Sequence, residues 1–190
     1  MRNLSTYLRQ FAFLSPDLDQ AVNKIVVPDP RTAKELYWKP GRGCPYIWYL
    51  ESGLLCIYEI NEGKEAFNWI QEGPGVFIEP VSSLGRRPYS RFYIQPIESC
   101  VAHRAEMQDL YDLIILYPEF STHYALINQY YREVGEKHKS DLLSLDARER
   151  LAKLVKEHPD WPKRIPHRIL WQYLGMAKNT FLKLRGEFGL

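Results

Sequence analysis

The sequence has few cysteines and no long apolar run. Its three cysteines, Cys44, Cys56 and Cys100, lie far apart in a chain of 190 residues. That pattern excludes a disulfide framework and a clustered zinc or iron–sulfur site. No stretch approaches the roughly 18 consecutive apolar residues that indicate a membrane span. The N-terminal segment also lacks the apolar centre and the small-residue cleavage site of a signal peptide. We therefore expect a cytoplasmic protein that has no metal site and no membrane partner.

Signals of enzymatic chemistry are also missing. None of the five histidines lies in the expected strand region before Ser99, where a metal-dependent barrel enzyme would need them. The sequence contains no glycine-rich phosphate loop and no nucleophile turn. The carboxylates Glu59, Glu62 and Glu65 surround an expected hairpin turn and are interpreted as solvated. We expect that the chain is not an enzyme and has no cofactor.

Positive charge is concentrated near the C-terminus. The whole chain has a net charge of only +2, with 45% hydrophobic and 14% aromatic residues, as expected for a folded domain with a core. Residues 162–190, however, carry six positive side chains and one negative side chain, Glu187. An anionic partner would explain this block, and a solvated helix face would explain it equally well.

The N-terminal part predicts a short helical region followed by strands. Ser15 and Pro16 form an N-cap and a first helical position. From residue 25 to about residue 102, short apolar runs are separated by glycine and proline, which is typical of an all-β barrel or jelly roll. Within this region "NEGK" (residues 61–64) predicts a hairpin turn, because Gly63 can adopt positive φ where the strands reverse.

A long helix is predicted from Pro118. Six of its residues are spaced alternately by four and three positions, which is the 3.5-residue repeat of a coiled coil. They are Phe120, Tyr124, Ile127, Tyr131, Val134 and His138. This seam could pack on its own domain or on its copy in a second subunit, and the sequence alone does not decide between them.

The last segment predicts two helices joined by a glycine turn. A further helix ends at Pro159, and then a helix from near Pro166 closes at Gly175. The sequence "MAKNTFLKLRGEF" forms the second, cationic helix, which gives the pattern of a helix-turn-helix. The residues expected to face inward are Ile169, Leu170, Tyr173, Leu174 and Phe181, together with Leu182 or Leu184.

The order of these parts resembles the Crp–Fnr family of transcription regulators, particularly its short Bacteroidetes-like members. The residues that carry the resemblance are "PYIWYLESGLLCIYEINEGKE", "LYPEF", "LSLDARERLAKLVKEHPDWPKRIP" and "YLGMAKNTFLKLR". The resemblance implies an α+β fold with an N-terminal double-stranded β-helix, or jelly roll, of the cyclic-nucleotide-binding type. A long dimerisation helix and a C-terminal helix-turn-helix of the winged-helix type would follow. The implied boundaries are 1–116, 117–140 and 141–190.

The resemblance also implies partners and contacts. A homodimer would form through the seam of the long helix, and double-stranded DNA would bind at the start of the last helix. Asparagine can hydrogen-bond base edges, and lysine can reach guanine or phosphate. The expected DNA-binding residues are Lys178, Asn179, Thr180, Lys183, Arg185 and Arg168.

The expected ligand pocket departs from the cyclic-AMP pattern of the family. In "FIEPVSSLGRRPYSRF", Glu79 could hold a ribose, but Ile78 replaces a glycine and Tyr89 replaces the phosphate-binding arginine. The purine-contacting pair of the long helix falls on Gly135 and Glu136. We therefore do not expect cyclic AMP, and favour an unidentified small-molecule effector or an empty pocket. The candidate pocket residues are Glu79, Ser82, Arg87, Tyr89, Ser90, Arg91 and Tyr131.

Trp171 is the second departure from the family pattern. The family usually has a small residue there, which lets the two last helices approach closely. A bulky indole would push them apart unless it turns outward. This motivates an alternative interpretation, in which the chain is a ligand-binding or protein-interaction module that has kept the fold and lost DNA readout.

Overall fold

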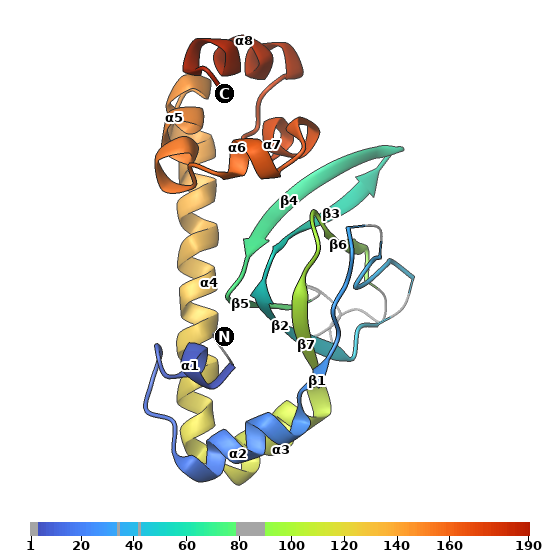
Figure 1. The fold of residues 1–190 in the computed structure, drawn as a ribbon, viewed down its shortest axis with the longest axis vertical. Helices are drawn as coiled ribbons and strands as arrows, with labels where there is room; N and C mark the ends of the chain where they lie inside the picture. The colour runs from blue at the N-terminus through green and yellow to red at the C-terminus, as the bar shows by residue number, and fades with distance from the viewer. Residues whose placement is uncertain (1–3, 34, 42, 79–89) are drawn as a thin grey trace.

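The computed structural model describes residues 4–33, 35–41, 43–78 and 90–190 (Figure 1). Two short helices and a strand come first: α1 (Leu4–Leu8), α2 (Pro16–Ile25) and β1 (Val27–Pro28). The remaining strands are β2 (Tyr46–Ser52), β3 (Leu54–Asn61), β4 (Lys64–Glu72), β5 (Gly75–Ile78), β6 (Phe92–Pro96) and β7 (Val101–Glu106). The helices that follow are α3 (Met107–Leu116), α4 (Pro118–Ser144), α5 (Ala147–Glu157), α6 (Trp161–Arg164), α7 (His167–Tyr173) and α8 (Lys178–Phe188).

The strands form two antiparallel sheets. One has the order β1-β7-β2-β5 and the other the order β4-β3-β6. The predicted hairpin turn is confirmed, since Asn61 pairs with Lys64 and both Glu62 and Gly63 have positive φ. A bulge at Asn68 shifts the register of β4 against β3, because Ile57 pairs with Trp69 while Tyr58 pairs with Phe67.

Strand β3 separates two hydrophobic cores. Its alternate residues Leu55 and Ile57 point inward to a core that both sheets share, with Trp48, Leu50 and Ile94. Since side chains alternate along a strand, Cys56 and Tyr58 point to the opposite face. That face packs against the C-terminal helices in a core that includes Leu151, Trp161, Leu170 and Phe181. The C-terminal helices therefore share a core with the sheet β4-β3-β6.

A third core joins the N-terminal helices to α3 and α4. The side chain of Ser15 accepts a hydrogen bond from the backbone N–H of Leu18, which confirms the predicted N-cap of α2. Leu18 and Phe120 are buried in this core. Helix α4 runs from this end of the molecule past the sheets to the C-terminal helices (Figure 1). Among the described residues no helix is both long enough and apolar enough to span a membrane.

Candidate nucleic-acid interface and ligand cavity

Helix α8 has one buried face and one exposed face. Phe181 and Leu184 are buried, whereas Leu182 is 42% exposed, so that Leu184 is the residue that completes the inward face. The exposed face brings together the polar residues expected at its start, and these are Lys178, Asn179, Thr180 and Lys183. Helix α8 lies at the end of the molecule opposite α2 and α3 (Figure 1), and these four residues are exposed.

Trp171 does not open the helix pair. Its ring packs edge-on against Phe181, with 6.3 Å between ring centroids, and Phe181 remains 1% exposed. The Lys178 ammonium lies 5.9 Å from the centre of the indole ring, in a cation–π contact. Helices α7 and α8 share one buried core, since Leu170 is 0% and Phe181 1% exposed, and the half-buried indole packs against that core.

Arg168 and Arg185 lie differently from the exposed lysines. Arg168 forms an ion pair with Glu65 of β4, and its guanidinium lies 5.6 Å from the centre of the Phe67 ring. Arg185 is half-buried. The interpretation of the three carboxylates as solvated is wrong for Glu65, which pairs with Arg168 of α7, and for Glu59, which is 15% exposed and pairs with Arg91. Part of the C-terminal positive charge therefore has a partner inside the chain.

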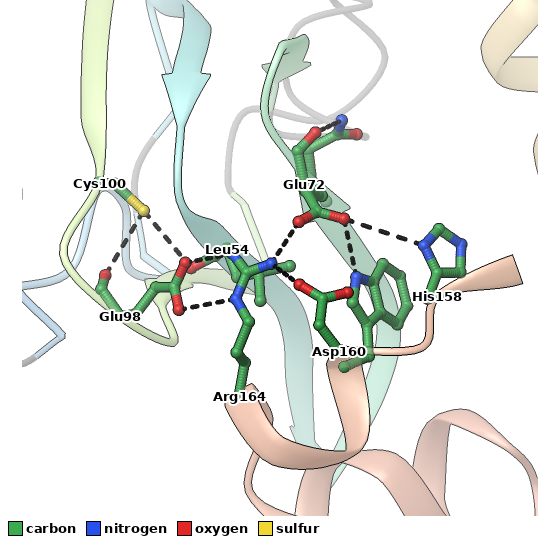
Figure 2. A network of polar contacts seen from close by, with 9 residues as sticks. Leu54, Glu72, Glu98, Cys100, His158, Asp160 and Arg164 are labelled. Carbon is green, nitrogen blue, oxygen red and sulfur yellow. Dashed lines mark hydrogen bonds and ion pairs between the residues drawn. The ribbon is translucent and has the colours of Figure 1, made fainter. Parts of the chain in front are cut away.

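Arg164 holds the C-terminal helices to the sheets through a cluster of carboxylates (Figure 2). Its guanidinium donates to Glu98 at 2.5 and 3.2 Å, to Glu72 at 2.5 Å, and to Asp160. The indole N–H of Trp161 donates to the second oxygen of Glu72 at 2.9 Å. Hereafter these five residues are the Arg164 cluster. Hydrogen bonds to Glu98 raise the pKa of the Arg164 guanidinium above its usual range.

The Arg164 cluster was not predicted from the sequence. Glu72 ends β4, Glu98 lies between β6 and β7, and Arg164 ends α6, so that the partners are up to 92 positions apart. No periodic pattern links residues at such separations. Arg164 belongs to the basic block of residues 162–190, but its charge is balanced within the chain by Glu72, Glu98 and Asp160.

The seam of α4 faces its own chain. Phe120 is buried among the N-terminal helices, and Ile127 packs against the same core. The Tyr131 hydroxyl accepts a hydrogen bond from the Val76 N–H at 2.8 Å and lies 3.1 Å from the Tyr7 hydroxyl. The His138 ring stacks on Tyr173 with 4.2 Å between centroids. These contacts show that Phe120, Tyr131 and His138 of the seam pack against other parts of the same chain. Tyr124 is 36% exposed and Val134 is half-buried, and the role of the seam in a dimer stays a prediction.

A cavity of about 580 Å³ lies between α4, the N-terminal helices and the sheets. Neighbouring residues of β5, Val76 and Phe77, both line the cavity although they point to opposite faces of the sheet. The cavity therefore extends around β5, which is an edge strand. Its walls are mostly aromatic and aliphatic, with Trp48, Trp69, Phe77, Ile127 and Tyr131 among them. Among the described lining residues none is a lysine, arginine, aspartate or glutamate.

Only part of the expected ligand pocket falls in this cavity. Tyr131 lines it. Ser90 is buried, and its hydroxyl bonds the backbone of Phe92, while Arg91 pairs with Glu59 at 3.2 Å; neither is among the described lining residues. Four further candidates, Glu79, Ser82, Arg87 and Tyr89, lie outside the described residues. Within the described ranges no group of three or more metal-binding side chains is arranged to hold a metal ion.

Similarity to known proteins is found at the level of the fold. No protein-family model and no curated protein matches the chain. The structure is similar to that of CLP, a c-di-GMP-responsive global regulator of Xanthomonas campestris, with a TM-score of 0.69 and 13% identity over 92% of each chain. It is similar to FixK2 of Bradyrhizobium japonicum, with a TM-score of 0.71 and 15% identity over 87% of this chain and 85% of that one.

A third similar structure is that of a protein assigned to the Crp–Fnr family. It is a transcriptional regulator from Eubacterium rectale, with a TM-score of 0.72 and 10% identity over 93% of this chain and 84% of that one. The chain therefore has the mixed helix and antiparallel-sheet fold of Crp–Fnr regulators, as the resemblance implies.

Proposed function

We propose that the chain is a DNA-binding transcription regulator of the Crp–Fnr type. In this proposal the two sheets are a jelly-roll sensor, and α7 with α8 is a helix-turn-helix whose second helix enters the major groove. The observation that carries it is the division of α8 into a buried apolar face and an exposed face bearing Lys178, Asn179, Thr180 and Lys183.

The exposed residues have the chemistry that reading DNA requires. Asn179 supplies an amide that can pair with the donor and acceptor of an adenine edge. Lys178 can reach guanine or phosphate, and Thr180 and Lys183 are placed to hold phosphates, which fix position without specifying sequence. Arg185 and Arg168 remain proposed phosphate contacts, the latter after release from Glu65. The similar structures support this role, since they are those of regulators.

The proposal includes a homodimer that binds two half-sites. Paired copies of α8 would enter adjacent major grooves about 34 Å apart on a two-fold symmetric operator. A small effector would act by binding more tightly to one of two arrangements of the dimer. No enzymatic step is part of this function.

The test is selection of binding sites from random-sequence duplex DNA, followed by affinity measurements at two salt concentrations. We expect enrichment of a two-fold symmetric site and an affinity that falls as salt rises. The variant Lys178→Ala/Lys183→Ala should lose binding. The variant Lys137→Ala/Lys139→Ala removes the same charge from α4 and should retain it. Equal binding by the two variants would contradict the proposed interface. If the wild type selects no site, the interaction-module alternative replaces this proposal.

A further inference from the structure

The cavity beside α4 differs chemically from a site for a charged nucleotide. Its described lining carries no acidic or basic side chain, apart from a histidine, His103. A cyclic phosphate needs a charge-assisted contact, and a charge buried without one loses hydration that nothing replaces. The described walls therefore favour an uncharged occupant.

The walls also indicate which uncharged molecules would fit. A cavity of about 580 Å³ falls in the range of sites that bind small organic ligands and cofactors. Trp48 and Phe77 stack in parallel on one side, with 5.3 Å between centroids, and Trp69 and Tyr131 meet edge-to-face at 6.4 Å. Such surfaces pack well against flat ring systems.

Polar groups lie where the cavity meets solvent. Asn68, the bulged residue of β4, and Asn128 of α4 both line the cavity and are both exposed. The Asn128 side chain donates to the Tyr124 carbonyl at 2.7 Å, and two other polar lining residues, Gln71 and Tyr131, also have partners within the chain. The Gln71 amide bonds Trp69 and the backbone of Glu72, and the Tyr131 hydroxyl bonds Val76. A ligand would therefore bury an apolar body and leave a polar end at the two asparagines.

We propose that this cavity binds an uncharged, ring-containing small molecule, with its apolar body between α4 and the sheets and its polar end near Asn68 and Asn128. The inference rests on the proposed function, because it assigns the effector of that regulator to a chemical class. Helix α4 forms one wall of the cavity through Ile127 and Tyr131, and it contacts the C-terminal helices through the stack of His138 on Tyr173. A bound ligand would therefore contact the helix that connects the sheets to α7 and α8.

The experiment uses the full chain and the uncharged fluorophore N-phenyl-1-naphthylamine as a probe. We expect saturable binding of one probe per chain, seen as enhanced fluorescence. Asn128→Trp narrows the open side and should weaken binding by about tenfold or more. Gln129→Trp places the same indole one residue further along the exposed part of α4 and should leave binding unchanged. Ile127→Trp fills the interior and should also weaken binding, in protein whose circular dichroism matches the wild type.

Three outcomes would overturn the inference: no saturable binding by the wild type, equal binding by Asn128→Trp and Gln129→Trp, or displacement of the probe by cyclic AMP. DNA binding is measured on the same preparations. If the wild type binds DNA site-selectively but does not bind the probe saturably, only the inference about the cavity is wrong. Probe binding without any DNA binding removes the proposed function and leaves the cavity as a ligand site.

Discussion

Arg164 contacts carboxylates from three parts of the chain, and its replacement should loosen the C-terminal helices from the sheets. Its side chain is 30% exposed, so solvent screens the cluster only partly. Arg164→Ala leaves Glu72 and Glu98 close together without their cation. We expect the free energy of unfolding to fall by about 1–3 kcal/mol, measured by urea denaturation.

Arg91 provides the matched control for Arg164. It forms a single ion pair, with Glu59, in which the Arg91 side chain is 58% exposed and the Glu59 side chain 15% exposed, so Arg91→Ala should lower the free energy of unfolding by no more than about 1 kcal/mol. If Arg164→Ala and Arg91→Ala have the same small effect, the Arg164 cluster does not stabilise the contact between the sheets and the helices.

His138 and His158 should make stability depend on pH. Burial lowers the pKa of both imidazoles below the ordinary value of 6.5, chiefly because the charged form is desolvated. The unfolded chain therefore binds protons first as pH falls. The stability that the neutral rings supply is complete above pH 6.5 and is lost as pH falls through the folded-state pKa values.

The variant His138→Gln isolates one of these rings. Because glutamine does not titrate, we expect its free energy of unfolding to fall less steeply than that of the wild type as pH is lowered below 6.5. The measurement is urea denaturation across that pH range. His158→Gln should flatten the same part of the profile, since its stack on Trp161 is also half-buried. A profile of His138→Gln that parallels the wild type would show that the stack on Tyr173 does not favour the neutral ring.

At the level of elements, the turn between α7 and α8 depends on a glycine. Gly175 has φ of +59°, and a Cβ there would lie 2.9 Å from Leu142 at the end of α4. Gly175→Ala should therefore destabilise the fold, by about 1–2 kcal/mol in the free energy of unfolding. Gly186 lies within α8 with open space around it, so Gly186→Ala should stabilise by about 0.5–1 kcal/mol. Thermal unfolding of both variants measures the change in Tm relative to the wild type. A change in Tm of the same sign in both variants would contradict this account of the turn.

Local signals predicted most elements because the chemistry that starts or ends them lies within a few residues. Ser15 with Pro16 begins α2, Gly63 turns the hairpin, and Gly175 separates α7 from α8. The seam of α4 is different. Its repeat shows that one face is apolar, but another part of the same chain and a second chain present the same kind of surface to it. The tertiary contacts of Phe120 and His138 show that part of the seam packs within the chain, and pairing of the seam with a second chain stays a prediction.

At the scale of the whole molecule, the sequence could not reveal how the C-terminal helices sit on the sheets. Charges that appear alike in the sequence separate in space. Arg164 and Arg168 pair with carboxylates of the strand region, whereas Lys178 and Lys183 remain on the exposed face of α8. The cavity was not predicted either, because the residues of its walls are spread along the chain from Leu4 to Tyr131 and are brought together only by folding.

The salt dependence of DNA binding should report how many copies of α8 touch DNA. Each phosphate contact releases counterions and contributes about 0.9 to the slope of log affinity against log salt concentration. If Lys183 holds one phosphate in each of two half-sites, Lys183→Ala should lower the slope by about 1.8, whereas a single bound copy predicts about 0.9. Lys139 is exposed on α4 and pairs with Glu136, so Lys139→Ala should leave the slope unchanged. Titration of the selected operator at four salt concentrations separates these cases. A change near 0.9 would contradict the paired docking of two helices while retaining Lys183 as a phosphate contact.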